Sequence, residues 1–275
     1  MIILDGKKVR DEKLKDLKNQ IKYIKMTLAV IQIGNDEASN IYINEKRKMC
    51  DYLNINFKHI LLDEKINTLE VEKVIEELNN SKDITGILLQ LPIPKHLDEK
   101  MLLNKINVYK DIDGLSDKSV ANFYYNKDGI IPCTPKGIIT LMDYYNITVA
   151  GKNVVIIGRS SLEAKPLFHL LLNKDATVTM CHSKTNNLKK ITKQADIIIT
   201  AVGKKNILTK DMVKKGVIVF DCGITRDNNK VIGDVDYQKV KSKTSYITPV
   251  PGGIGPMTIL SLAENIYIAY LKQNS

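Results

Sequence analysis

A tyrosine and a lysine stand one helical turn apart early in the chain. Tyr42 and Lys46 lie in a segment with helical spacing, from Ser39 to about Tyr52, so the two side chains can project together into one cleft. A partly desolvated lysine has a lowered pKa and can exchange protons with a substrate. The same segment carries a charge run, Glu45 to Lys48, of the kind that is usually solvated. The spacing alone therefore leaves a catalytic face and an exposed face as alternatives.

An amide and an acid follow at positions that suit ligand binding. Gln90 ends the apolar run that begins at Gly86, and Asp113 precedes Gly114 in a short turn. A polar side chain at the carboxyl end of a strand or in a glycine turn can reach a ligand. Both residue types also serve as caps and in Asx-turns, so the sequence leaves both interpretations open.

A glycine turn between a strand and a helix indicates a coenzyme site further along the chain. The apolar run Val154 to Ile157 leads into Gly158, Arg159 and Ser160, and a helical segment follows. Free backbone N–H groups and the helix dipole favour a phosphate at such a turn. The usual glycine pattern is incomplete, because Ser160 and Glu163 replace its second and third glycines. Gly158 could therefore also be a simple turn that ends a strand.

Hydroxyl and cationic residues follow the next predicted strand. Ser183 and Lys184 stand where an NAD enzyme normally has an acid for the ribose 2′-hydroxyl. Together with Arg159 they suit a 2′-phosphate, which favours NADP over NAD. Small residues after two further strands, at 201–203 and 221–224, would let a ligand approach the backbone. They favour a coenzyme site over a plain surface loop.

Composition narrows the class of protein. A length of 275 residues, 44% of them hydrophobic, predicts two ordered domains. The net charge of +10 is spread along the chain and only 6% of residues are aromatic, which favours a solvated surface over nucleic-acid binding. The four cysteines and four histidines show no ligand spacing, so we expect reduced thiols and no metal. Without a secretory signal or a long apolar span, we expect a cytoplasmic protein that contacts no membrane.

Strand and helix periods alternate along the chain. The expected strands cover residues 27–33, 55–62, 86–90, 154–157, 176–181, 197–200 and 217–220. The expected helices cover residues 39–52, 68–78, 136–145, 162–172, 188–194 and about 256–271, with a loop at 109–135. This pattern predicts an α/β protein with two parallel-sheet domains. One comprises residues 1–138 completed by 257–275, and a Rossmann-like domain comprises residues 139–256.

Seven short blocks, taken in order, resemble one enzyme family over almost the whole chain. They are Ser39-x-x-Tyr42-x-x-x-Lys46, Leu89-Gln90-Leu91-Pro92, Lys110-Asp111-Ile112-Asp113-Gly114, Pro132-Cys-Thr-Pro-Lys-Gly137, Gly158-Arg159-Ser160, Cys181-His-Ser-Lys-Thr185 and Thr248-Pro-Val-Pro-Gly-Gly-Ile-Gly-Pro-Met-Thr258. Each could occur by chance, but the ordered set is specific. The chain is similar to the bifunctional methylenetetrahydrofolate dehydrogenase/methenyltetrahydrofolate cyclohydrolase family.

The resemblance implies oxidation of 5,10-methylenetetrahydrofolate by NADP to the methenyl cation, followed by hydrolysis to 10-formyltetrahydrofolate. It implies an N-terminal folate-binding catalytic domain and an NADP domain, with the active cleft between them. By similarity, Tyr42 would stack on the folate and Asp113 would hydrogen-bond the amino edge of the pterin. Lys46 and Gln90 would be the catalytic pair.

The coenzyme residues of the family also carry over to this chain. They are Gly158, Arg159, Ser160, Ser183 and Ile224. The chain departs from the family at Glu163-Ala164, where relatives usually have Val-Gly, and a carboxylate here could repel a phosphate or alter the NAD/NADP preference. The resemblance further implies a homodimer paired through the NADP domain and a place in purine, methionine and histidine biosynthesis.

Two other functions remain as alternatives. One is a dehydrogenase-only relative that has lost hydrolysis, although Lys46 and Gln90 are both present. The other is a basic nucleic-acid-binding protein, which would bind a duplex with steep salt dependence and would not respond to NADP.

Overall fold

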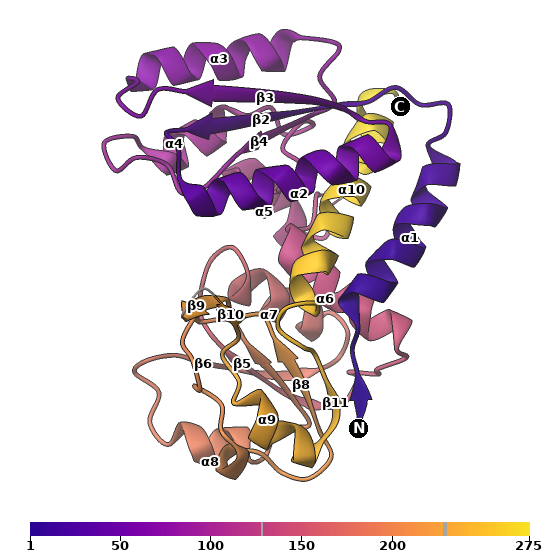
Figure 1. Cartoon of the computed structure of the whole chain (residues 1–275), viewed down its shortest axis with the longest axis vertical. Coiled ribbons are helices and arrows are strands. Elements are labelled where there is room, and N and C mark those ends of the chain that lie inside the picture. The colour runs from indigo at the N-terminus through magenta and orange to yellow at the C-terminus, as the bar shows by residue number, and fades with distance from the viewer. Residues whose placement is uncertain (128, 228–229) are drawn as a thin grey trace. The chain divides into compact units, whose positions relative to one another are not determined.

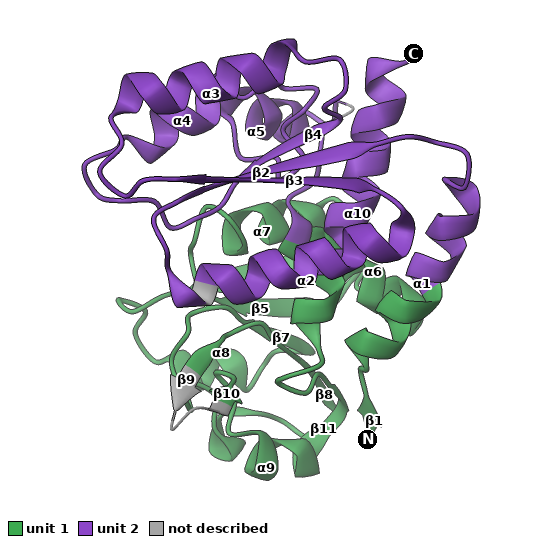
Figure 2. Cartoon of the chain, turned by 45° about the horizontal axis from the view of Figure 1, so that its top comes forward, with its two compact units in different colours: residues 1–12, 134–258 green, residues 13–133, 259–275 purple. Residues whose placement is uncertain are grey.

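The computed structural model describes residues 1–127, 129–227 and 230–275, and the chain divides into two compact units (Figure 2). Unit 1 comprises Met1–Glu12 and Thr134–Thr258, and unit 2 comprises Lys13–Cys133 and Ile259–Ser275. Each unit contains a parallel sheet with helices packed on it. The predicted two-domain α/β fold is confirmed.

Unit 2 is built on a parallel sheet with the strand order β3-β2-β4. Its strands are β2 (Thr27–Ile33), β3 (Asn56–Leu62) and β4 (Gly86–Leu89). Its helices include α2 (Glu37–Leu53), α3 (Thr68–Asn80), α4 (Glu99–Lys105) and α5 (Asp117–Tyr124). Helices α3 and α4 cover one face of the sheet and α2 covers the other (Figure 1). Because both faces are covered, the central strand β2 is an almost continuous apolar run.

Local hydrogen bonds fix the segments that carry the polar residues of unit 2. The carboxylate of Asp36 accepts from the Ser39 amide at 2.7 Å and begins α2. At the other end of the unit, Lys110 Nζ donates to the Leu78 carbonyl at 3.0 Å and the Ser81 carbonyl at 2.6 Å. A cation suits the carbonyl end of α3, so this lysine anchors the turn that leads to Asp113.

Unit 1 is built on a six-stranded parallel sheet with the order β1-β11-β8-β7-β5-β6. Its strands are β1 (Ile2–Ile3), β5 (Asn153–Ile157), β6 (Thr177–Cys181), β7 (Ile197–Thr200), β8 (Val217–Asp221) and β11 (Thr244–Ile247). An antiparallel pair, β9 (Thr225–Asp227) and β10 (Lys230–Ile232), lies outside it. The strand order reverses at β5, which has β6 on one side and β7 on the other. Open α/β sheets bind ligands at the carboxyl ends of the strands beside such a reversal.

The remaining helices belong to unit 1 or continue into it. They are α1 (Gly6–Gln20), α6 (Cys133–Tyr144), α7 (Ala164–Leu172), α8 (Leu188–Thr192), α9 (Tyr237–Val240), α10 (Ile254–Gln273) and the short 3₁₀ helices η1 (Lys210–Met212) and η2 (Lys241–Lys243). By length and composition α10 could cross a bilayer, but half of its most apolar window is buried within the chain. Core helices pass the same test, and Leu260 and Ile266 of α10 are completely buried.

Some predicted elements differ from the structure. The prediction of a loop at 109–135 was wrong in part, because this segment contains α5, which begins at the N-cap Ser116 and buries Phe123.

The first twelve residues group differently from the predicted domain boundaries. Strand β1 pairs with β11, and the Asp5 amide donates to the Tyr145 hydroxyl at 3.0 Å, so residues 1–12 belong to unit 1. The assignment of folate to residues 1–138 and of NADP to residues 139–256 stays a prediction.

Candidate functional site

A hydrogen bond joins Lys46 of α2 to Gln90, the residue that follows β4. Lys46 Nζ donates to Gln90 Oε1 at 2.6 Å, and Gln90 Nε2 donates to the Leu91 carbonyl at 2.6 Å. The second bond fixes the amide so that its oxygen faces the lysine. Gln90 is buried, with 7% of its surface exposed. Helix α2 and the end of β4 thus place the Lys46 amine next to the Gln90 amide.

Asp113 is the acid next to this pair. Burial raises the pKa of Asp113, and the positive charge of Lys46 opposes that rise. The turn around Asp113 is held by a different acid, since Asp111 accepts from the Gly114 amide at 3.0 Å and the Ser116 amide at 2.8 Å. The Asx-turn function that the sequence allowed for Asp113 is therefore carried by Asp111.

The environment of Lys46 favours proton exchange. Burial lowers the pKa of Lys46, while the charge of Asp113 and the Cys133 thiol act in the opposite direction. Desolvation dominates, so the neutral amine is more accessible near neutral pH than in an exposed lysine. An amine in this state can take a proton and give it back.

Tyr42 lies on α2 one turn before Lys46 and is 43% exposed. The structure thus brings Lys46, Gln90 and Asp113 together and leaves the Tyr42 ring half-exposed on the neighbouring turn. A ring in this position can stack against a flat ligand. The roles assigned to these four residues remain predictions.

Two residues beside this cluster were not predicted as functional. Cys133 is 4% exposed, and its thiol acts on the pKa of both Asp113 and Lys46. Asn265 of α10 is completely buried and donates to the Cys133 sulfur at 3.6 Å. Cys133 stands in the Pro-Cys-Thr-Pro block, which could have drawn attention to it, whereas Asn265 is a single amide in an apolar helix.

The predicted coenzyme turn in unit 1 has the backbone that a close approach requires. Gly158 follows β5 with a φ of +147°, and a Cβ there would lie 2.6 Å from the Ala201 carbonyl. Only glycine fits such a position. Arg159 and Ser160 are exposed, and Ser160 Oγ accepts from the Ala164 amide at 3.2 Å at the start of α7. The turn and the helix N-terminus suit a phosphate.

The other predicted coenzyme residues follow neighbouring strands of the same sheet. Ser183 follows β6 and is exposed, in a turn where the His182 amide donates to Thr185 Oγ1 at 2.8 Å. Ile224 follows β8 and is 46% exposed. The carboxyl ends of parallel strands share one edge of the sheet, so Gly158, Ser183 and Ile224 belong to that edge. Hydroxyl, guanidinium and apolar groups there fit a dinucleotide.

Glu163 takes the N-cap position of α7. Burial raises the pKa of Glu163, and the negative charge of Asp234 raises it further. Asp234 itself holds the loop after β7 by accepting from the Val202 amide at 2.8 Å and the Lys204 amide at 2.6 Å. An ionised Glu163 would repel a phosphate at this helix end, whereas a protonated one would not.

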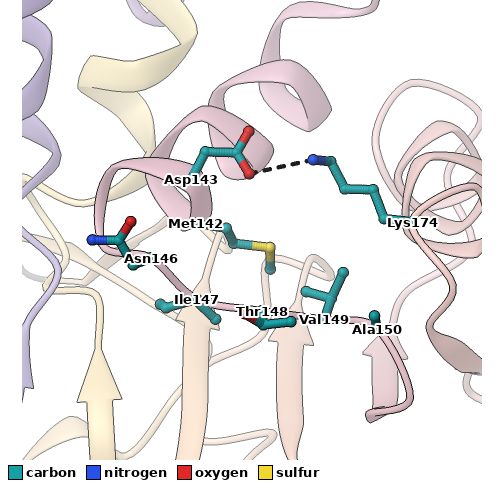
Figure 3. A pocket seen from close by; sticks show the side chains of 8 residues that line it. All are labelled: Met142, Asp143, Asn146, Ile147, Thr148, Val149, Ala150 and Lys174. Carbon is teal, nitrogen blue, oxygen red and sulfur yellow. Dashed lines mark hydrogen bonds and ion pairs between the residues drawn. The ribbon is translucent and has the colours of Figure 1, made fainter.

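A separate pocket in unit 1, of about 410 Å³, is lined by the end of α6, by residues 146–150 that follow this helix, and by Lys174 (Figure 3). On its rim Lys174 Nζ lies 3.3 Å from Asp143 Oδ1. Apolar side chains, Met142, Ile147 and Val149, line it. It includes none of the predicted site residues. Within residues 1–127, 129–227 and 230–275, no group of three His, Cys, Asp or Glu residues could hold a metal ion.

Two family models match the chain. The tetrahydrofolate dehydrogenase/cyclohydrolase catalytic domain matches residues 4–113, and the NAD(P)-binding domain of the same enzymes matches residues 132–274. The chain belongs to the tetrahydrofolate dehydrogenase/cyclohydrolase family. The resemblance inferred from the seven blocks is confirmed.

Full-length relatives support both activities of the family. The bifunctional protein FolD of Acholeplasma laidlawii is 49% identical over 274 residues, which cover 99% of each chain. The crystal structure of the bifunctional enzyme FolD from Campylobacter jejuni is 42% identical, with a TM-score of 0.96 over 99% of each chain. The Trypanosoma brucei FolD complexed with NADP and an inhibitor is 29% identical, with a TM-score of 0.95 over 100% of this chain and 98% of that one. The chain is a bifunctional dehydrogenase/cyclohydrolase, which the matches favour over a dehydrogenase alone.

Proposed function

We propose that this member of the family oxidises 5,10-methylenetetrahydrofolate with NADP and hydrolyses the methenyl product at a site formed by Lys46, Gln90 and Asp113. The observation that carries the proposal is the hydrogen bond from Lys46 Nζ to Gln90 Oε1 at 2.6 Å. The positive charge of the same amine also acts on the neighbouring acid Asp113 and opposes the rise in its pKa. This arrangement gives a fixed, partly desolvated base next to a group that can orient a substrate.

Lys46 would accept the proton that hydrolysis releases. When water adds to the cationic methenyl carbon, an oxygen–carbon bond forms and one proton must leave. The Lys46 amine takes that proton, which its lowered pKa permits. The adduct then opens as the bond from this carbon to the ring nitrogen breaks, and the hydroxyl proton moves to that nitrogen. The product is the 10-formyl compound.

Gln90 and Asp113 would position the substrate and the base. The Gln90 oxygen holds the Lys46 amine in one direction, so the base does not have to be ordered at the moment of reaction. The Asp113 carboxylate presents two acceptor oxygens, which suit the amino edge of a pterin. Tyr42, half-exposed on the adjacent turn, would stack on the folate ring.

NADP supplies the hydride acceptor for the first reaction when it is bound. We assign its phosphates to the turn of Gly158, Arg159 and Ser160, and its 2′-phosphate to Arg159 and Ser183. Support comes from the exposed cation and hydroxyls at the carboxyl edge of the sheet and from the relative that is complexed with NADP. Ile224 would contribute an apolar contact at the same edge.

One assay tests both activities. With 5,10-methylenetetrahydrofolate and NADP supplied, the concentrations of NADPH and of the methenyl compound are followed together by absorbance. We expect NADPH to form while the methenyl compound stays low, because hydrolysis removes it. Accumulation of the methenyl compound in step with NADPH would instead identify a dehydrogenase without hydrolysis.

We also propose that the enzyme is a cytoplasmic homodimer paired through the NADP-binding domain, with a role in purine, methionine and histidine biosynthesis. This part is supported by the family resemblance. Light scattering of the purified chain measures the oligomeric state, and a monomer would contradict it.

A further inference from the structure

Two buried acids of unit 1 lie close to the strand ends that carry the predicted coenzyme residues. Asp221 is the last residue of β8 and is 3% exposed, and Asp234 lies two residues after β10 and is completely buried. Neither was predicted as a site residue. Buried polar groups of this kind are normally hydrogen-bonded, so their partners indicate which segments they hold.

Asp234 holds the loop that follows β7. Its Oδ2 accepts from the Val202 amide at 2.8 Å, and its Oδ1 accepts from the Lys204 amide at 2.6 Å. Both oxygens of the carboxylate are used by the same loop, which an amide side chain with a single oxygen could not reproduce. Glycine at position 223 leaves room for this group, because a Cβ there would overlap the carboxylate. The carboxylate therefore fixes the shape of the loop.

Asp221 in turn holds the segment that contains Asp234. Its Oδ1 accepts from the Asp234 amide at 2.9 Å, and its Oδ2 accepts from the Val235 amide at 3.0 Å. The hydroxyl of Thr200, the last residue of β7, donates to the same Oδ1 at 3.0 Å. The ends of β7 and β8 are thus connected through Asp221 and Asp234 to the loop after β7.

This loop lies between two of the proposed coenzyme segments. A Cβ at Gly158 would lie 2.6 Å from the Ala201 carbonyl, and a Cβ at Gly203 would lie 3.6 Å from the Ile224 carbonyl. The loop is therefore next to the proposed phosphate turn after β5 and next to Ile224 after β8. Val202 in the same loop is 43% exposed, so a ligand at this edge of the sheet can reach it.

We propose that Asp234, held by Asp221, is a positioning residue that keeps the loop after β7 in the shape that binds NADP. The inference rests on the proposed function, because it concerns the coenzyme site assigned there. The affinity for a ligand falls with the fraction of molecules whose site has the competent shape. A loop that has lost its anchor should therefore bind NADP more weakly and still support hydride transfer once NADP is bound.

Replacing Asp234 by asparagine tests this role by direct binding. Asparagine has nearly the same size, but one of its two terminal groups is a donor, so one of the two loop amides loses its acceptor. From the strength of a hydrogen bond to a charged group, we expect the Kd for NADP to rise about tenfold. Titration calorimetry of the full chain measures this Kd without turnover, and an unchanged Kd would overturn the proposal.

Asp196→Asn is the matched control. Asp196 accepts from the Asn153 amide at 2.9 Å, so this variant also removes a carboxylate that binds a backbone N–H group of unit 1. Asp196 precedes β7 and Asn153 begins β5, which places the pair at the amino edge of the sheet. We expect the wild-type Kd for NADP. A rise equal to that in Asp234→Asn would overturn the specific role of Asp234.

The rates of the two reactions separate positioning from a general loss of structure. In Asp234→Asn the KM for NADP should rise about as much as the Kd, with little change in kcat. Hydrolysis of methenyltetrahydrofolate supplied without NADP should keep its wild-type rate, because Lys46 belongs to unit 2. Equal losses in both reactions would identify a structural role and overturn the proposal.

Asp221→Asn tests the second step, because it weakens the bonds that hold Asp234. The Kd for NADP should rise in this variant too, and an unchanged Kd would remove Asp221 from the role. Thermal unfolding identifies variants that fail to fold, and if Asp234→Asn is one of them, the Kd of Asp221→Asn decides. A wild type that binds no NADP would refute the proposed coenzyme, whereas normal binding in both variants would refute the positioning role alone.

Discussion

Replacing Lys46 by arginine separates the charge of the site from its ability to exchange a proton. Arginine stays protonated at any working pH and has several N–H donors. It can therefore donate to Gln90 and keep a positive charge beside Asp113, but it cannot accept the proton that water releases. We expect Lys46→Arg to lose hydrolysis and to retain oxidation of the methylene compound, so that the methenyl compound accumulates.

The size of the loss follows from the function that is removed. General acid–base catalysis contributes about 10²–10⁴-fold, which corresponds to about 2.7–5.4 kcal/mol of activation free energy. Lys46→Met should do more, because it also leaves the buried Gln90 oxygen without its donor. That loss costs about 1–3 kcal/mol, and the neighbouring Asp113 loses its counter-charge. We therefore expect arginine to lower kcat with little change in KM, and methionine to affect both.

The assay uses each substrate separately. Methenyltetrahydrofolate supplied alone reports hydrolysis, and the methylene compound with NADP reports formation of NADPH. Lys48→Met is a matched control on the same helix, because the Lys48 side chain is 72% exposed and pairs with Glu45 at 2.7 Å. Both rates should stay unchanged in this control. Hydrolysis at the wild-type rate in Lys46→Arg would refute Lys46 as the proton acceptor.

Three further predictions concern the coenzyme site. Arg159→Ala should raise the KM for NADP by about ten- to a hundredfold and change the KM for NAD much less; equal effects on both would remove Arg159 from the 2′-phosphate. Because burial raises the pKa of Glu163, its charge appears as the pH rises, so titration calorimetry should find weaker NADP binding at higher pH. Glu163→Val should flatten that dependence, and an unchanged slope would contradict the assignment. Gly158→Ala places a Cβ 2.6 Å from the Ala201 carbonyl and should lower the free energy of unfolding by about 1–3 kcal/mol. The control is Gly151→Ala, which should lower it less, because φ is also positive there but no atom lies close to the added Cβ.

Strands β2 and β7 were predictable because burial on both faces leaves a plain apolar run. The predicted strands at 27–33 and 197–200 coincide with β2 and β7. Strand β1 has two residues and exists through its pairing with β11, more than 240 positions away, so no local pattern indicates it. Helix α5 is short and buries few side chains, and its polar composition made the segment resemble a loop. Whether β1 and α5 form depends on pairing with a distant strand and on burial in the folded protein.

At the candidate site, too, some residues can be recognised from a local pattern, whereas others depend on partners that are distant in the sequence. Lys46 and Asp113 carry charges whose spacing and turn context are visible in the sequence. Asn265 acts on backbone carbonyls and a thiol far away in the chain, and backbone acceptors leave no signature in residue types. Its position within an apolar helix gives no indication of a polar function. A buried amide of this kind becomes recognisable once its partners are known.

Burial moves the pKa values of Lys46 and Asp113 toward each other, lowering that of the amine and raising that of the acid. Each charge also favours the charged form of the other group, so the pKa of each depends on the charge of its neighbour. A substitution at either residue should therefore move both limbs of the pH profile. At a single pH, a lower rate of hydrolysis can result from loss of the proton acceptor or from a shift of one limb of the pH profile, and the two effects are not separated. The comparison of Lys46→Arg with the wild type consequently requires the full profile, in which a missing base lowers the maximum and an altered charge moves its edges.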